Sequence, residues 1–229
     1  VADHAISLWL TLARKLPFYD KATKSGIWKW QSGAPIHRIR GCLMGIVSFG
    51  TIGQAIADRA RAFGVEIIVY DPFISPAVVQ EYGGRLVDKA TLLKESDYLI
   101  MQAPMNDDTR HFLSYDEFAQ MKTNAIVVNT GRGPTIDNKA LYKALTENQI
   151  AAAGLDDPEE EPAKRATWSP DDNPIFTLPN VIVTPHAAYY SEESIQMARE
   201  TAADEVASVL LGKKPKYPLN TAELAASQK

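Results

Sequence analysis

The sequence predicts an α/β fold with a doubly wound parallel sheet, and three observations support this prediction. Residues 45–71 contain an apolar run, a glycine-bearing turn, a helical stretch and a second apolar run. Five further short apolar runs then alternate with helical patterns, as in parallel sheets joined by right-handed crossovers. The 229 residues are 45% hydrophobic, which is enough to fill the core of such a sheet.

The first expected element is a helix that begins directly after Val1. Ile6, Leu10 and Ala13 recur at helical spacing, and Leu16 or Pro17 stands at its close. Large apolar residues also lie on a second side of this helix. It is therefore expected either to pack against a second body as well as its own domain, or to be buried within one core.

The remaining elements follow from periodicity along the chain. Residues 18–39 have weak periodicity and are expected to form a loop with at most one short helix. A final helix is expected over residues 191–211, with Ser191 as N-cap and Gly212 at its C-terminal end. Residues 1–190 are interpreted as a nucleotide-binding domain, and residues 191–229 as a trailing helix and tail. The apolar runs predict strands at residues 45–47, 67–70, 86–87, 98–101, 125–128, 152–155 and 181–184.

Composition narrows the class of protein. The net charge of −4 offers no general basicity to attract nucleic acid. Cys42 is the only cysteine, so no internal disulfide and no cysteine-based metal centre is expected, which agrees with a reducing compartment. No apolar run approaches the roughly 20 residues that span a bilayer. A cytoplasmic protein without a metal site or membrane partner is expected.

The turn after the first strand has the layout of a dinucleotide site. Gly50 and Gly53 let the backbone approach a pyrophosphate at a helix N-terminus, and Ser48 stands where the first glycine of the pattern belongs. Asp71 follows the second strand, where a carboxylate accepts from the adenosine ribose. The layout indicates NAD. The alternative is a similar unit that binds no phosphate, with Asp71 capping a turn before Pro72.

Polar and small residues follow the later strands, at the edge where ligands bind in doubly wound sheets. Arg132 lies between two glycines, and its guanidinium could hold a carboxylate by a bidentate fork. His186 follows Pro185 and could exchange a proton near neutral pH. A carboxylate from the acidic stretch 156–162 could face it. Arg132 could equally be a surface residue, and His186 a structural one.

The other three histidines are interpreted as structural groups. They are His4, His37 and His111. A lone histidine in a loop or helix is more often a satisfied structural group than a catalytic one.

Taken together, four separate motifs resemble those of the D-isomer-specific 2-hydroxyacid dehydrogenases. These motifs are residues 45–53 with Asp71, residues 129–133, Leu155-Asp156 followed by Glu161-Pro162, and residues 184–188. The resemblance covers nearly the whole chain. Residues 184–192 are most similar to the branch that contains the C-terminal binding proteins and phosphoglycerate dehydrogenase-like enzymes.

The resemblance implies a hydride transfer between NAD(H) and a D-2-hydroxy acid or its 2-oxo acid. Arg132 would hold the substrate carboxylate, His186 would be the general acid/base, and Glu161 would pair with His186. Asp71, without a neighbouring arginine, argues for NAD over NADP. The residues implied at the cofactor are Gly50, Thr51, Ile52, Gly53, Asp71, Ala103, Pro104, Thr109, Thr130, Gly131, Arg132, Asp156, His186 and Ala188; among them, Asp156 would take the nicotinamide carboxamide.

Departures from the family pattern leave alternatives open. Asp157-Pro158 replaces a usual apolar pair, so Glu160 is the second candidate partner of His186. Thr51 stands where an arginine often touches phosphate. Family members also carry about a hundred residues ahead of the first helix, one small domain's worth.

A second class of function also remains open, an NAD-sensing, dimeric binding protein with little dehydrogenase activity. Tyr189 occupies the position at which the C-terminal binding proteins carry a tryptophan, which favours the enzyme. The resemblance further implies a homodimer and a small-molecule acid as substrate, without naming the acid.

Overall fold

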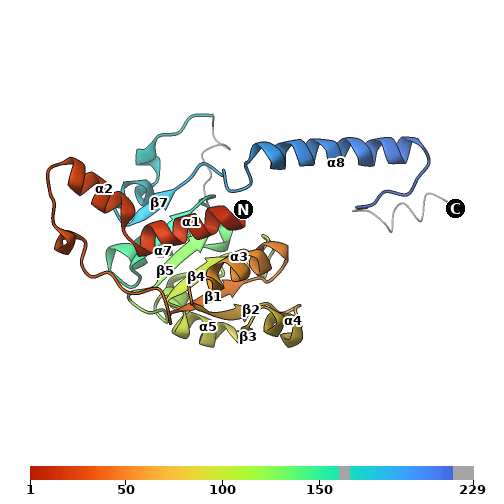
Figure 1. Cartoon of the computed structure of the whole chain (residues 1–229). Coiled ribbons are helices and arrows are strands. Elements are labelled where there is room, and N and C mark those ends of the chain that lie inside the picture. The colour runs from red at the N-terminus through yellow and green to blue at the C-terminus, as the bar shows by residue number, and fades with distance from the viewer. Residues whose placement is uncertain (160–165, 219–229) are drawn as a thin grey trace. The chain divides into compact units, whose positions relative to one another are not determined.

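Seven parallel strands form one sheet in the computed structural model, which describes residues 1–159 and 166–218 (Figure 1). The order across the sheet is β3-β2-β1-β4-β5-β6-β7. The predicted α/β fold and all seven predicted strand positions are confirmed. The strands are β1 (Leu43–Val47), β2 (Glu66–Tyr70), β3 (Gly84–Leu86), β4 (Tyr98–Met101), β5 (Ile126–Asn129), β6 (Ala152–Leu155) and β7 (Val181–Val183).

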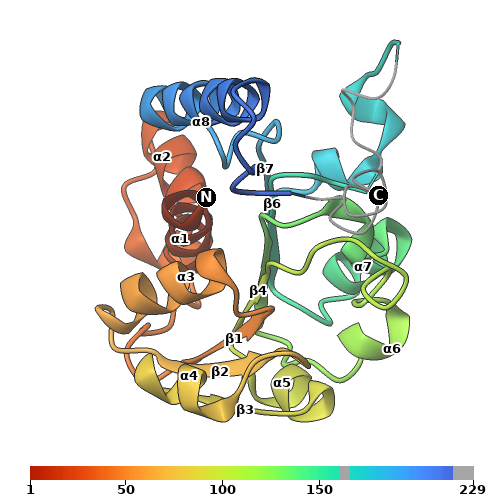
Figure 2. The same ribbon diagram turned by 90° about the vertical axis from the view of Figure 1, so that its right-hand side faces the viewer.

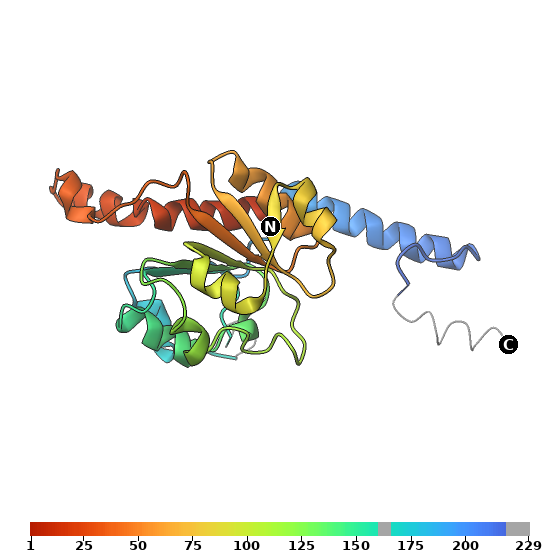
Figure 3. The same ribbon diagram turned by 90° about the horizontal axis from the view of Figure 1, so that it is seen from below.

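Helices cover both faces of the sheet, as Figure 2 shows with the sheet seen nearly edge-on. One face carries α1 (Ala2–Ala13), α3 (Thr51–Arg61) and α4 (Pro76–Glu81). The other face carries α5 (Lys89–Glu95), α6 (Tyr115–Phe118) and α7 (Asn138–Thr146). Figure 3 shows the same three layers from below, with the red α1 and the green α7 on opposite sides of the sheet.

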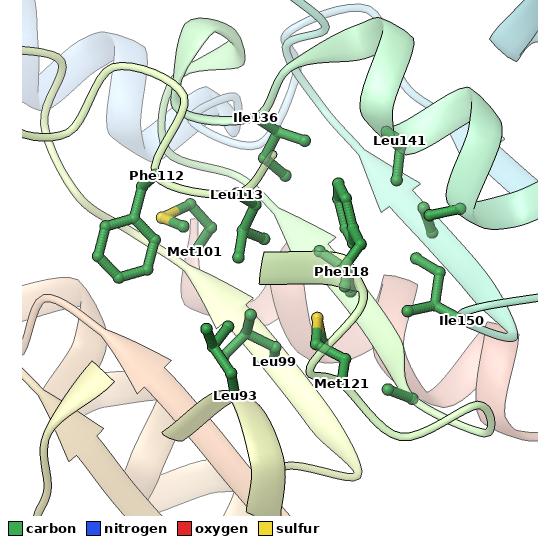
Figure 4. Packing of buried hydrophobic residues seen from close by; sticks show 14 of the residues in the cluster. Leu93, Leu99, Met101, Phe112, Leu113, Phe118, Met121, Ile136, Leu141 and Ile150 are labelled. Carbon is green, nitrogen blue, oxygen red and sulfur yellow. The ribbon is translucent and has the colours of Figure 1, made fainter. Parts of the chain in front are cut away.

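The core lies in two clusters, one on each face of the sheet, and β4 supplies both. Tyr98 and Ile100 pack in the cluster beneath α1 and α3, whereas Leu99 and Met101 pack in the cluster beneath α5 to α7 (Figure 4). All four residues of β4 are buried. Strands that are covered on both faces need apolar residues at every position, which is why they appear as continuous apolar runs in the sequence.

Helix α1 packs against the sheet, and the apolar residues on both of its sides are buried. Leu8, Trp9 and Leu12 all belong to the core. The Trp9 ring meets the rings of Phe63 and Tyr98 edge-on, with centroids 5.6 and 5.2 Å apart. The large side chains that suggested a second partner for this helix are therefore covered by its own unit.

The segment after α1 has more helix than the sequence predicted. α1 ends at Ala13, and α2 (Leu16–Lys24) begins with Pro17 in its first turn. A 3₁₀ turn, η1 (Trp30–Gly33), follows. Only Ala22 of α2 is buried, so this helix lacks the apolar stripe by which helices are recognised in a sequence. Further 3₁₀ turns occur at η2 (Gly133–Thr135), η4 (Pro170–Asp172) and η5 (Pro174–Thr177).

The chain divides into two compact units, Val1–Ala188 and Tyr189–Lys229. The second unit contains α8 (Glu192–Leu210). The Ser191 hydroxyl caps this helix by accepting a hydrogen bond from the Ser194 amide at 3.1 Å, and Gly212 follows its end with φ 73°. Both predicted ends of the helix are confirmed. Within the described parts of the chain, no helix combines the length and the apolar content needed to cross a bilayer.

A candidate dinucleotide and acid/base site

The candidate site lies at the carboxyl edge of the sheet, where five neighbouring strands end level with one another. The strand register pairs the last residue of each strand directly with that of the next. The residues that follow these ends are therefore neighbours across the sheet, although up to 136 positions separate the strand ends in the sequence. The paired end residues are Val47, Met101, Asn129, Leu155 and Val183.

The glycine turn lies where the strand order reverses, between β1 and β4. Ligands of doubly wound sheets bind at this switch point. Ser48, which replaces the first glycine of the pattern, has φ 72° and therefore adopts the left-handed conformation that glycine adopts without strain. Its amide donates to the Tyr70 carbonyl at 2.9 Å, which fixes the turn against β2. The serine fits the turn, but in a strained backbone.

Gly50 and Gly53 have different physical roles in this turn. Gly50 is the N-cap of α3, and a Cβ at this position would meet no atom within 4 Å. The space in front of it is therefore open, beside a helix N-terminus of the kind that attracts anions. A Cβ at Gly53 would lie only 2.5 Å from the Ser48 carbonyl oxygen. Thr51 and Ile52, between them, are exposed in the first turn of α3.

Asp71 lies at the end of β2 with its carboxylate directed to the same turn. Its Oδ2 accepts from the Phe49 amide at 2.7 Å, and its Oδ1 accepts from the Phe73 amide at 2.9 Å. Each carboxylate oxygen has two lone pairs, so acceptor sites remain for a hydroxyl group. The carboxylate thus adjoins the proposed phosphate position, as contact with an adenosine ribose requires.

The segments after β4 and β5 are joined by side-chain hydrogen bonds. The Gln102 amide group donates to the Thr130 hydroxyl across the two strands. Thr109 donates to the Pro104 carbonyl at 2.6 Å and closes the loop that follows β4. Ala103 is buried, whereas Pro104 is exposed. Small and polar groups therefore line this part of the sheet edge.

Arg132 is presented by a rigid turn after β5. The buried Asn129 side chain accepts from the Gly131 amide at 3.0 Å and donates to the Arg132 carbonyl at 3.0 Å. The Arg132 side chain is exposed, and its Nη1 donates to the Gly131 carbonyl at 2.8 Å. A guanidinium has five N–H donors, so this contact leaves donors for a carboxylate ligand.

The Asp157-Pro158 pair, which departs from the family pattern, packs directly on this turn. A Cβ at Gly133 would lie 2.5 Å from the Pro158 carbonyl group. Asp157 is 3% exposed, and its Oδ2 accepts from the Gly133 amide at 3.3 Å. Its Oδ1 is buried without a hydrogen-bond partner among the described residues. The polar residue therefore occupies a buried position that an apolar side chain could also fill.

Asp156 organises the segment that follows β7. It is 2% exposed, and its carboxylate accepts from the Ala187 and Ala188 amides, each at 2.8 Å. The Thr184 hydroxyl also donates to Asp156 Oδ1, at 2.5 Å. The expected contact of Asp156 with the nicotinamide carboxamide would have to share a carboxylate that already binds three donors of its own chain.

His186 is held in a left-handed backbone conformation, with φ 52°. Its amide donates to the Asp156 carbonyl at 2.7 Å. The backbone of His186 therefore lies at the carboxyl edge beside β6, on the same edge as the turn of Arg132 and the glycine turn. Glu161 and Glu160, the two candidate partners of His186, lie outside the described residues.

Two histidines that the sequence analysis treated only as structural groups contact this region. His4 Nε2 lies 2.9 Å from the Thr184 hydroxyl and 3.5 Å from Asp156 Oδ1. His111 Nε2 lies 2.6 Å from Glu159 Oε1, so it links the loop after β4 to the loop after β6. No local sequence signal reveals either contact, because His4 and Thr184 are 180 positions apart.

Comparison with known proteins shows the family to which the chain belongs. The model of the family "D-isomer specific 2-hydroxyacid dehydrogenase, NAD binding domain" matches residues 6–188. The D-3-phosphoglycerate dehydrogenase of Methanocaldococcus jannaschii is 41% identical over 213 residues, which are 93% of this chain and 39% of that protein. The glyoxylate reductase of Thermococcus litoralis is 38% identical over 232 residues, which are 99% of this chain and 68% of that protein.

A solved structure gives the same picture of the fold. The D-lactate dehydrogenase of Lactobacillus jensenii with NAD⁺ superposes with a TM-score of 0.86 at 28% identity, over 96% of this chain and 68% of that one. The chain thus spans between about two fifths and two thirds of the length of these relatives.

Relief of backbone strain is expected to stabilise the turn. Ser48→Gly should raise the free energy of unfolding by about 1 kcal/mol or somewhat less, because glycine removes the left-handed penalty but adds freedom to the unfolded chain. Denaturant unfolding measures this change. Ser48→Ala keeps a side chain at the same φ, so it serves as the control and should not raise the free energy of unfolding. Equal stability of the Gly and Ala variants would contradict the assignment of strain.

Substitutions at the two turn glycines should have different effects on stability and on NADH binding. Gly50→Ala should lower the free energy of unfolding by no more than about 1 kcal/mol, because alanine is a poorer N-cap than glycine, and should weaken NADH binding at least about tenfold, because its methyl group enters the open space before the turn. Gly53→Ala should destabilise the chain, because its methyl group strikes the Ser48 carbonyl oxygen. Unfolding curves and NADH fluorescence titrations measure both. Unchanged NADH affinity in Gly50→Ala would place the pyrophosphate elsewhere.

Proposed function

Because the chain belongs to the family of D-isomer-specific 2-hydroxyacid dehydrogenases as their NAD-binding domain, we propose that the protein catalyses hydride transfer between NAD(H) and a D-2-hydroxy acid or its 2-oxo acid. One observation above all supports this proposal. An arginine, a histidine and the glycine turn, from three distant parts of the sequence, share the carboxyl edge of a single sheet. The relatives named D-3-phosphoglycerate dehydrogenase, glyoxylate reductase and D-lactate dehydrogenase are consistent with it.

The residues of the turn would hold the cofactor. Gly50 leaves room for the pyrophosphate at the N-terminus of α3, and Asp71 accepts from the ribose hydroxyl groups. A phosphate on that ribose would meet the negative charge of Asp71, which favours NAD over NADP. The nicotinamide supplies or accepts the hydride, and the protein supplies position and charge.

The proton and the substrate carboxylate are handled by side chains of this chain. Arg132 binds the carboxylate with its guanidinium fork and stabilises the negative charge that develops on the C2 oxygen. His186 gives a proton to that oxygen during reduction and removes it during oxidation. Glu161 pairs with His186 in this scheme, and Glu160 is the alternative partner.

Removal of the Arg132 or the His186 side chain should strongly lower turnover without weakening cofactor binding. In the complete protein, Arg132→Ala and His186→Ala should each lower kcat/KM for 2-oxo acids by about a hundredfold or more, since charge stabilisation and proton transfer each contribute on that scale. NADH affinity should stay within about twofold, because the turn of residues 48–53 lies on other strands. A panel of 2-oxo acids, followed by nicotinamide absorbance, measures the rates.

The exposed His37 provides the matched control for this experiment. His37→Ala removes an imidazole outside the site and should keep the rates of the unaltered protein. Near-normal rates in the Arg132 and His186 variants would refute the assigned roles. Binding of NADH without turnover of any 2-oxo acid by the unaltered protein would instead favour the NAD-sensing function.

We also propose that the protein forms a homodimer through the segment that contains α2 and η1. This segment exposes large apolar side chains to an extent that a free surface rarely does, including Trp28 at 87% and Trp30 at 75%. Phe18 and Ile27 of the same segment are also exposed.

A charge in this surface should prevent self-association. Light scattering should give twice the chain mass for the unaltered protein and the monomer mass for Trp28→Lys, because a buried lysine would be unpaired in the interface. Phe73→Lys, at another exposed aromatic residue, is the matched control and should remain dimeric. A monomeric unaltered protein would exclude the dimer.

A further inference from the structure

His4 connects the first helix of the chain to the segment that carries His186. Its side chain is 27% exposed and projects from the first turn of α1 toward the end of β7. Its Nε2 lies 2.9 Å from the Thr184 hydroxyl and 3.5 Å from Asp156 Oδ1. His4 therefore contacts two residues of the candidate site at once.

The protons of this contact can be assigned from the hydrogen bonds. The Thr184 hydroxyl has one proton, and it donates that proton to Asp156 Oδ1 at 2.5 Å. The Thr184 oxygen can then only accept from His4. His4 must therefore carry its proton on Nε2, either as that neutral tautomer or as the imidazolium. A donor chain runs from His4 through Thr184 to the Asp156 carboxylate.

Asp156, at the end of this donor chain, holds the backbone around His186. The same carboxylate accepts from the Ala187 and Ala188 amides, each at 2.8 Å, and the Asp156 carbonyl accepts from the His186 amide at 2.7 Å. His186 has a left-handed φ of 52°, a conformation that persists only where surrounding contacts enforce it. These contacts supply that enforcement.

We propose that His4 is a positioning residue for His186. Its Nε2–H fixes the Thr184 hydroxyl on Asp156, and the Asp156 carboxylate then fixes the amides of residues 187 and 188 and the direction of the His186 side chain. The donor chain needs an N–H at one defined point of α1. Glutamine places a side-chain amide near the position of Nε2, so it can replace the imidazole, whereas alanine cannot.

Amide hydrogen exchange tests this proposal directly on the chain itself. The Ala187 and Ala188 amides should exchange about tenfold faster in His4→Ala, and His4→Gln should restore them to within about twofold, because the carboxylate that accepts from them loses or regains the contact that positions it. Amides of the central strands β1 and β4 should not change, which separates loss of position from loss of global stability.

A second pair of variants tests the donor chain at Thr184, its middle residue. Thr184→Val keeps the shape of the side chain but removes the hydroxyl, and Thr184→Ser keeps the hydroxyl. Faster exchange of the Ala187 and Ala188 amides in Thr184→Val, but not in Thr184→Ser, supports the donor chain even if His4→Ala does not fold. Exchange that stays within twofold of the unaltered protein in both His4→Ala and Thr184→Val overturns it.

The effect on chemistry rests on the proposed dehydrogenase function and is measured apart from the exchange. In the complete protein, His4→Ala should lower kcat about tenfold and leave the KM for NADH nearly unchanged, with recovery in His4→Gln. A change in KM for NADH alone would contradict a positioning role. If the unaltered protein turns over no 2-oxo acid, the proposed function fails, and the exchange result alone decides the positioning of His186.

Discussion

The parallel register of β1, β4, β5, β6 and β7 is the constraint on which the site depends. Because adjacent strands lie about 4.8 Å apart and end level with one another, the next residue of each strand meets its neighbours without a long side chain. The Gln102–Thr130 and Thr184–Asp156 hydrogen bonds both join such neighbouring ends. The sheet thereby converts distant sequence segments into one continuous row of functional groups.

Two residues at this edge have a strained backbone conformation. Ser48 and His186 both adopt positive φ, and each is held by a backbone hydrogen bond to the adjacent strand or its end, at 2.9 and 2.7 Å. A left-handed residue costs about 1 to 2 kcal/mol, which the many contacts of the sheet can offset. Lys15, His111 and Asn148 have the same conformation, so positive φ alone does not identify the site.

The sequence predicted the sheet well because strands buried on both faces leave a direct signal, a short run of apolar residues. Such runs predicted all seven strands, and the sheet brings the residues after five of them to one edge, although their functional roles stay a prediction. α2 was underestimated because its single buried residue, Ala22, produces no periodic pattern. The contact of His4 with Thr184 was missed because it depends on how α1 packs across β5 and β6, which no local spacing encodes.

The burial of Asp157 shows a different limit of sequence reasoning. An acidic stretch is normally interpreted as solvated, yet Asp157 is 3% exposed beneath the turn of Gly133. The chain buries this carboxylate because Pro158 and Gly133 pack without a gap, which fixes the loop whatever the polarity of the side chain. Close backbone packing thus outweighed the charge preference at this position.

Asp156 shows why a carboxylate, rather than an amide of the same shape, occupies the end of β6. Its Oδ1 accepts from the Thr184 hydroxyl and the Ala187 amide, while its Oδ2 accepts from the Ala188 amide. An asparagine would direct its NH₂ group at donors in either orientation, so one side of the arrangement would always be broken. Burying a charge costs several kcal/mol, and hydrogen bonds to a charged acceptor, each about 1.5 to 3 kcal/mol, offset that cost. The negative charge therefore serves as the anchor of the loop that carries His186.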